Sequence, residues 1–173
     1  TPAYVLLDIN GDGLSDLVVT DECDAGGGGD VGERHWLVWF NTGAGFEPDP
    51  SEWAIPGRSY AGDETFDLLA GEGDCGGFTE RPSWATLDLD GDGAPEFVVT
   101  DICDINDIGE SRWLVYENNG AGFATRSTDW QLPGNQFSGD ETFDLTAEQL
   151  DCSGNDEVPT YGLFDHNGDG LPD

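Results

Sequence analysis

The sequence predicts an all-β protein built from tandem four-stranded antiparallel sheets, each about the size of one blade. Two observations lead to this prediction. The chain of 173 residues repeats itself at long range, and within each repeat the apolar residues fall in short strand-like runs. No segment sustains apolar residues at helical spacing over three turns. A third observation, an acidic loop that occurs three times along the chain, indicates a binding role for the turns between strands.

Several stretches occur twice along the chain. They are LVVTDECD (17–24) and FVVTDICD (97–104), WLVWFNTGAGF (36–46) and WLVYENNGAGF (113–123), and GDETFDL (62–68 and 139–145). The offset is 80 residues before the GGGG of 26–29 and 77 after it, so one three-residue gap aligns the copies. We therefore expect one repeat unit at 1–80, a second at 81–157, and only the opening of a third, truncated unit at 158–173.

Within each unit the strands are expected in a fixed order. The strand-like runs of the first unit are YVLL (4–7), DLVVT (16–20), HWLVWFN (35–41) and SEWAI (51–55). They are rich in β-branched and aromatic residues and are bounded by Gly, Asn, Asp and Pro. An irregular acidic tail follows near 57–80 and again near 134–157. Because Trp36, Trp53, Trp113 and Trp130 sit in strand patterns, core packing is the favoured role for them over sugar stacking.

The charge of the chain is extreme. It has 37 Asp and Glu against 5 Arg and no Lys, for a formal net charge of −32. Nucleic acid and anionic lipid both require Lys and Arg, so neither is an expected partner. Disorder is not expected for most of the chain, because 11% of its residues are aromatic. No apolar run approaches the ~20 residues of a membrane helix. Multivalent cations or high salt would offset the repulsion.

An acidic nine-residue loop occurs between the first two strand-like runs of each unit. Oxygen ligands at positions 1, 3 and 5, a backbone carbonyl at position 7 and an acid at position 9 would surround a hard cation. Glycine at position 6 permits the backbone angle that closes the loop. The predicted ligands are Asp8, Asn10, Asp12, the Leu14 carbonyl and Asp16; Asp88, Asp90, Asp92, the Ala94 carbonyl and Glu96; and Asp165, Asn167, Asp169, the Leu171 carbonyl and Asp173.

Calcium is the expected ion. Carboxylates without sulfur or imidazole favour it over zinc and copper, and magnesium would require stricter octahedral geometry. An EF-hand or dockerin-like loop is excluded, because position 12 is Val19 in the first loop and Val99 in the second, where an acid would be needed. A turn rich in Asn and Asp that binds nothing is the simple alternative for one such loop. Three copies with an acid at position 9 favour the metal.

The combination of DINGDGLSDLVV with WLVWFNTGAGF resembles the FG-GAP/VCBS repeat family. The resemblance covers residues 1–46 and 81–123, and 158–173 as far as that stretch goes; 47–80 and 124–157 have no counterpart in it. It implies blades of the β-propeller type, an extracellular or cell-surface location and structural calcium. Glu96 departs from the Asp that the family places at position 9, which implies a different denticity or a weaker site.

The four cysteines are Cys23, Cys75, Cys103 and Cys152. An even count in a Gly-rich, Lys-free chain fits an oxidising, extracellular setting, with buried free thiols as the alternative. We expect disulfides Cys23–Cys75 and Cys103–Cys152, because each pair lies within one unit and joins equivalent positions. A Cys75–Cys103 bridge between neighbouring units is the competing scheme.

The predicted function is that of a secreted, calcium-binding structural or adhesive repeat protein. Its expected partners are other copies of the repeat or adjoining segments of a longer chain. Because 2–16 and 159–173 are the same part of a unit, two units do not close a ring, and an array or filament is favoured. The alternatives are a calcium-dependent carbohydrate-binding module, whose partners would be glycans or cell-surface proteins, and a non-catalytic propeller segment of a large secreted enzyme or toxin.

GDETFDL is either a second cation site or a set of solvated acids. No enzyme is expected, since His35 and His166 have no catalytic partners in the pattern.

Overall fold

A computed structural model of the chain describes residues 3–21, 31–32, 34–56, 83–101, 108–109, 111–132 and 171. Every regular element in these ranges is a β-strand. This part of the chain accordingly offers no helix that is long and apolar enough to cross a membrane. The predicted all-β class is confirmed for the described residues.

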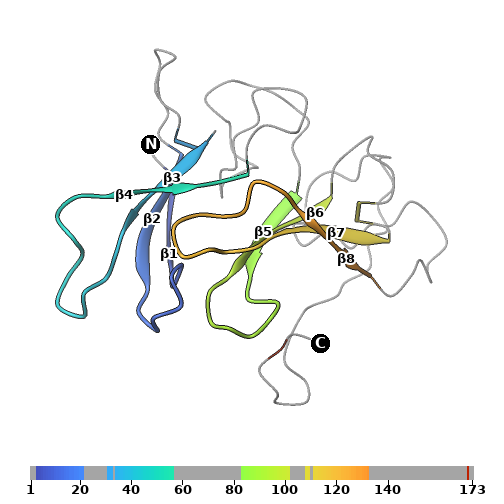
Figure 1. The fold of residues 1–173 in the computed structure, drawn as a ribbon. Coiled ribbons are helices and arrows are strands. Elements are labelled where there is room, and N and C mark those ends of the chain that lie inside the picture. Colours follow the sequence, from blue (N-terminus) through green and yellow to red (C-terminus); the bar gives the residue numbers. More distant parts are fainter. Residues whose placement is uncertain are drawn as a thin grey trace, which may run out of the picture.

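The strands form two antiparallel sheets of four strands each, in sequence order (Figure 1). The first sheet contains β1 (Ala3–Leu7), β2 (Asp16–Asp21), β3 (His35–Trp39) and β4 (Ser51–Ala54). The second contains β5 (Ser83–Leu87), β6 (Glu96–Asp101), β7 (Arg112–Tyr116) and β8 (Thr128–Gln131). Each repeat therefore forms one sheet, with its strands in the predicted order. The boundaries of the units at 80/81 and 157/158 fall outside the described residues.

The two sheets share one strand register. Trp36 pairs with Trp53 across β3 and β4, and Trp113 pairs with Trp130 across β7 and β8. Both first hairpins also shift register at the same place, one residue into β1 and one residue into β5. Residues 80 or 77 apart are thus structurally equivalent, which lets each position in one sheet be compared with its counterpart in the other.

Each sheet has two distinct faces. The face that carries Trp36 and Val38 in the first sheet, and Trp113 and Val115 in the second, is here called the tryptophan face. The other, called the opposite face, carries Leu37 in the first sheet. Period-two alternation creates this division, and β3 shows it directly, since Trp36 and Val38 are buried while the residues beside them are only partly so.

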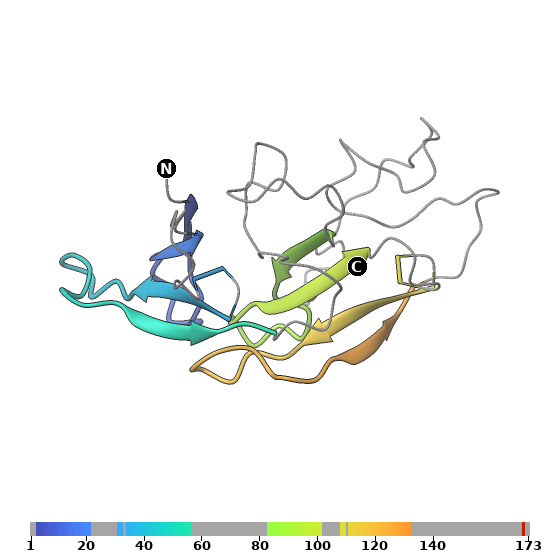
Figure 2. The ribbon, with the colours of Figure 1, turned by 90° about the horizontal axis from the view of Figure 1, so that it is seen from above.

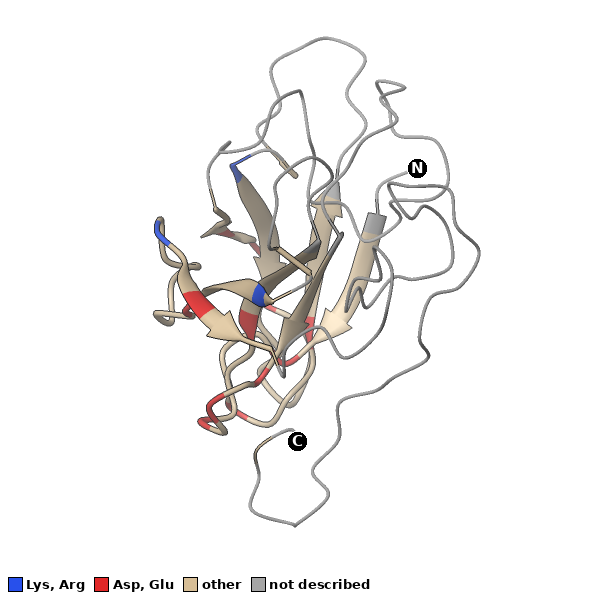
Figure 3. Ribbon diagram, turned by 90° about the vertical axis from the view of Figure 1, so that its right-hand side faces the viewer, with Lys and Arg blue, Asp and Glu red and all other residues tan. Residues whose placement is uncertain are grey.

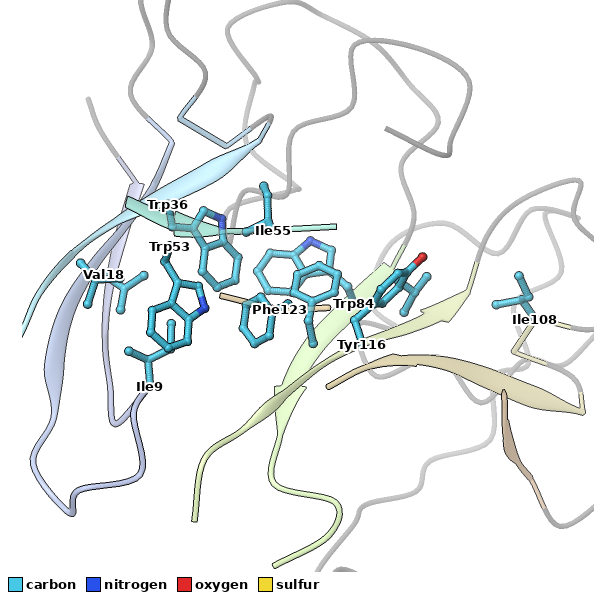
Figure 4. Close-up of a cluster of buried hydrophobic side chains, with 12 residues drawn as sticks. Ile9, Val18, Trp36, Trp53, Ile55, Trp84, Ile108, Tyr116 and Phe123 are labelled. Carbon is cyan, nitrogen blue, oxygen red and sulfur yellow. The ribbon is translucent and has the colours of Figure 1, made fainter. Parts of the chain in front are cut away.

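The main core lies where the tryptophan face of the first sheet packs on the opposite face of the second (Figure 4). Aromatic rings dominate this contact. Trp36 lies 5.4 Å from Trp84 and 5.8 Å from Phe97, measured between ring centroids, and Trp53 meets Phe123 edge-on at 6.0 Å. Such pairs contribute about 0.5–1.5 kcal/mol each beyond the area they bury. The core therefore joins the two repeats rather than standing inside either one.

Backbone groups also join the two sheets. The N–H of Phe123 donates to the carbonyl of Ala54 at 2.8 Å, and Asn118 Nδ2 donates to the carbonyl of Ile9 at 2.8 Å. At Gly122 the chains approach so closely that an added Cβ would lie 2.8 Å from the Cβ of Ala54. Figure 2 shows β4 running toward the hairpin between β7 and β8 at this point. The relative placement of the sheets is thus fixed by hydrogen bonds as well as by packing.

Core packing is confirmed for three of the four strand tryptophans and is wrong for the fourth. Trp36, Trp53 and Trp113 are buried, whereas Trp130 is exposed. Both Trp53 and Trp130 lie in the last strand of their sheet, but Trp53 packs against Phe123 of the neighbouring sheet, whereas β8 is exposed along its whole length. Sequence equivalence between Trp53 and Trp130 does not extend to their surroundings.

Several predictions concern residues outside the described part of the chain. They are the pairing of Cys23, Cys75, Cys103 and Cys152, the role of both GDETFDL stretches, and the third loop apart from Leu171. These stay predictions.

Candidate metal centre

The loop between β5 and β6 brings three acidic side chains together. One carboxylate oxygen each from Asp88, Asp90 and Glu96 lies within 4.8 Å of the other two. Glu96 is the first residue of β6 and pairs with Leu87, the last residue of β5. The hairpin therefore closes directly beneath the triad, and the strand pairing holds the first and last acids near one another. Oxygen ligands at this separation could hold a metal ion.

Backbone N–H groups orient these carboxylates. The two oxygens of Asp88 accept from Gly91 and Gly93, at 2.8 and 3.1 Å, and Glu96 Oε2 accepts from Leu89 at 2.8 Å. Gly91 and Gly93 have φ of 76° and 95°, a region that L residues rarely adopt. The glycines thus turn their N–H groups inward, and the first acid is held in place without any ion.

The fifth-position acids also accept backbone hydrogen bonds. Asp92 Oδ1 accepts from the N–H of Ala94 at 2.8 Å, and Asp12 Oδ1 accepts from the N–H of Leu14 at the same distance. Three of the five predicted ligands of the second loop therefore converge, whereas Asp92 and the carbonyl of Ala94 are not part of the triad. Their ligand roles stay predictions.

The loop between β1 and β2 has a similar hydrogen-bond pattern. The N–H of Asp12 donates to Asp8 Oδ1 at 3.0 Å and to Asn10 Oδ1 at 2.9 Å, so these two oxygens converge on one donor. Asp16 accepts from the N–H of Ile9 at 3.3 Å and from that of Asn41 at 2.8 Å. The amide of Asn10 replaces the carboxylate of Asp90, which leaves this loop with one negative charge fewer.

The ninth-position acids are buried. Asp16 and Glu96 are both fully or almost fully removed from solvent. Burial raises the pKa of each carboxyl, backbone N–H donors lower it, and the neighbouring acids of the same loop raise it again. Burial is the largest of these effects in both cases. A bound cation would favour the charged form, because it supplies the opposite charge that the apolar surroundings lack.

The two loops touch each other. An added Cβ at Gly11 would lie 3.0 Å from the backbone of Gly93 and of Ala94. Figure 3 shows acidic residues gathered at the lower end of the sheets, where both loops lie. Of the third loop only Leu171 is described, and it is exposed, as Leu14 is at the same position of the first loop. The candidate centre is thus at least two adjacent loops at one end of the sheets.

Two asparagines support the loops and were not singled out from the sequence. Asn41 Nδ2 donates to the carbonyl of Ser15 at 2.9 Å, and Asn118 Nδ2 donates to that of Pro95 at 3.1 Å. Each ties the end of a loop to the hairpin after the third strand of its sheet. The signal that would have found them is their recurrence in FNTGAGF and ENNGAGF.

Comparison with known proteins gives no match, whether to a family model, to a curated protein or to a solved structure. Membership of the FG-GAP/VCBS family therefore stays a hypothesis based on the loop and strand motifs.

Proposed function

We propose that this chain is a calcium-binding structural or adhesive repeat protein of the extracellular space, with blade-like units of the FG-GAP/VCBS type. The observation that carries the proposal is the triad of Asp88, Asp90 and Glu96, whose oxygens approach within 4.8 Å of one another in a loop already shaped by backbone hydrogen bonds. Such preorganisation lowers the ordering cost of ion binding.

The choice of calcium rests on donor chemistry. Every predicted side-chain ligand in the two described loops is a carboxylate or an amide oxygen, and calcium accepts six to eight oxygen ligands with flexible geometry. We propose the extracellular setting because an even count of four cysteines fits an oxidising compartment, where calcium also fills sites of low affinity. The net charge of −32 favours a compartment rich in divalent cations, because unscreened acids repel one another.

Calcium titration by calorimetry, combined with thermal unfolding, tests this proposal. Saturating calcium at a hundredfold excess over the dissociation constant stabilises the fold by about 2.7 kcal/mol per site. Chelation should therefore lower the unfolding temperature by several degrees. Adding magnesium afterwards should recover a smaller part of this loss than adding calcium does. An unfolding temperature that is the same with chelator and with calcium would refute the proposal.

A calcium-dependent carbohydrate-binding module is the second candidate. The exposure of Trp130 and Tyr4 favours it, because aromatic rings open to solvent are the usual platforms for sugars. A glycan array probed in calcium separates the two functions. Saturable binding to one class of sugar, lost on Trp130→Ala, would favour the carbohydrate-binding module.

A further inference from the structure

The opposite face of the first sheet is open, although its counterpart in the second sheet is buried. Tyr4 is 66% exposed where the equivalent Trp84 is 7% exposed, and Phe46 is 46% exposed where Phe123 is 2% exposed. Leu6 adds a further side chain that is 59% exposed. Since the two sheets share one register, this difference comes from what covers each face and not from the strands themselves.

The open face is nevertheless apolar. Strand register places six apolar side chains on it from β1, β2 and β3: Tyr4, Leu6, Leu17, Val19, Leu37 and Trp39. A contiguous apolar surface rimmed by acids marks an interaction site in a soluble protein. A polar face would be expected here if the sheet met only water.

A matching aromatic side chain is exposed at the far end of the molecule. Trp130 is 42% exposed, whereas its equivalent Trp53 is 1% exposed and packs edge-on against Phe123. Phe46 and Trp130 are therefore the equivalents of a packed pair, and both are uncovered. The hairpin that carries Phe46 and strand β8 lie at opposite ends of the pair of sheets (Figure 2). The two side chains can meet only between two molecules.

We propose that a second copy of the chain docks head to tail, placing the Trp130 edge of its second sheet on the open face of the first sheet. This deepens the proposed function and rests on it, since it names the surface and the partner through which units stack. The internal contact of β4 with the β7–β8 hairpin supplies the template, and Phe46 takes the place of Phe123 in it. Trp113, Val115 and Val98, the equivalents of Trp36, Val38 and Val18, are already buried, so the new contact is limited to the β8 edge of that face. A contact between unlike faces continues from copy to copy.

Polar groups at the open face fit the same template. Asn118 Nδ2 donates both to Pro95 in its own unit and to Ile9 across the contact. Asn41 likewise donates one Nδ2 proton to the carbonyl of Ser15 in its own unit. In the proposed contact its other Nδ2 proton would reach the carbonyl of Leu89 in the second copy, because Leu89 is the equivalent of Ile9. Gly45, like Gly122, leaves room for a neighbouring backbone, because a Cβ there would meet nothing within 4 Å.

Two further features make this contact weaker than the internal one. Glu117 stands where Phe40 packs against Trp53 in the first sheet, at a centroid distance of 6.3 Å. Each copy also carries a formal charge of −32, so association should tighten with calcium and with moderate salt.

Sedimentation velocity over a range of protein concentrations, in calcium and moderate salt, tests the proposal with the full chain. The wild type should form dimers and longer chains. Phe46→Ser and Trp130→Ser should each weaken association at least about thirtyfold, because central aromatic residues dominate such contacts. Glu47→Ser, the neighbouring position on the same hairpin, should have no such effect. Glu117→Phe should tighten association.

Mixing the two aromatic variants identifies the mode of contact. Each retains one intact end, so an equimolar mixture should form dimers and nothing longer. A Trp130→Ser variant that still dimerises by itself would indicate pairing of two open faces and overturn the head-to-tail mode. A wild type that stays monomeric at all concentrations would overturn docking altogether.

Calcium titration of the same samples separates this inference from the proposed function. Calcium binding without association refutes the docking alone, whereas absence of calcium binding refutes the function. Circular dichroism of each variant, together with dimer formation in the mixture, establishes that the variants are folded.

Discussion

Replacing Gly122 with alanine tests the contact between the sheets, because Gly45 provides a matched control. The two glycines are equivalent and have nearly the same φ, 153° and 150°. A Cβ at 122 would lie 2.8 Å from the Cβ of Ala54, 2.9 Å from its nitrogen and 3.0 Å from its oxygen. A Cβ at 45 would meet nothing within 4 Å.

The expected magnitudes follow from this difference. Both variants strain the backbone, at a cost of about 1–3 kcal/mol that is common to the two. Only Gly122→Ala adds a steric clash, worth about 1–3 kcal/mol, because backbone atoms of Ala54 are unable to rotate away. The hydrogen bond from Phe123 to Ala54 would lengthen as well, at about 1 kcal/mol. Gly122→Ala should therefore be less stable than Gly45→Ala by about 2 kcal/mol or more.

Urea unfolding in calcium, at concentrations where the chain is monomeric, measures this difference. The midpoint of Gly122→Ala should fall further than that of Gly45→Ala, with similar slopes. Equal loss of stability in the two variants would refute the close contact between β4 and the β7–β8 hairpin.

Three further predictions concern the loops and their supports. Glu96→Gln should remove one calcium site in calorimetry, and it should stabilise the calcium-free protein while destabilising the calcium-saturated one, since burial penalises the unpaired charge. In the folded protein, burial raises the pKa of Asp16 and Glu96 above the ordinary values of 3.8 and 4.5. Without calcium, the folded state therefore holds these two protons more tightly than the unfolded state does. The resulting stabilisation is fully present below the ordinary values and is lost as the pH rises through the folded pKa. The unfolding free energy measured in chelator should therefore decline as the pH rises through this window. In calcium it should rise, because the ion competes with protons for the same carboxylate oxygens. A parallel trend under both conditions would contradict the metal assignment. Asn118→Ala should cost about 1 kcal/mol more than Asn41→Ala, because only Asn118 also bonds to Ile9, and equal costs in urea unfolding would count against that bond.

The strands and their order were predictable from the sequence because their signals are local. The run HWLVWFN is rich in β-branched and aromatic residues, which indicates a strand, and recurrence of WLV around Trp113 indicates a second one. The spacing of Asp88, Asp90 and Glu96 likewise predicted convergence, because a hairpin loop returns its ends to one place.

The surroundings of equivalent residues were not predictable. Trp53 and Trp130 occupy the same position in the same pattern, yet one is buried by the neighbouring sheet and the other is exposed. A repeat encodes its own strands but carries no local signal for which copies it will touch. The hydrogen bond from Ala94 to Asp92 was not predictable either, since backbone N–H groups and a cation compete for the same oxygens and spacing does not rank them.

The approach of Gly11 to the backbone of Gly93 and Ala94 bears on how such a chain changes over generations. If the proposed calcium binding holds, the acids of both loops are under selection from the ion, whereas Gly11 is also under selection from its contact with the neighbouring repeat. A mutation of Asp90 would weaken ion binding and leave the contact at Gly11 intact. A lineage that ceased to bind metal could thus lose its acids by drift while Gly11 stayed under selection, so long as the repeats remained side by side.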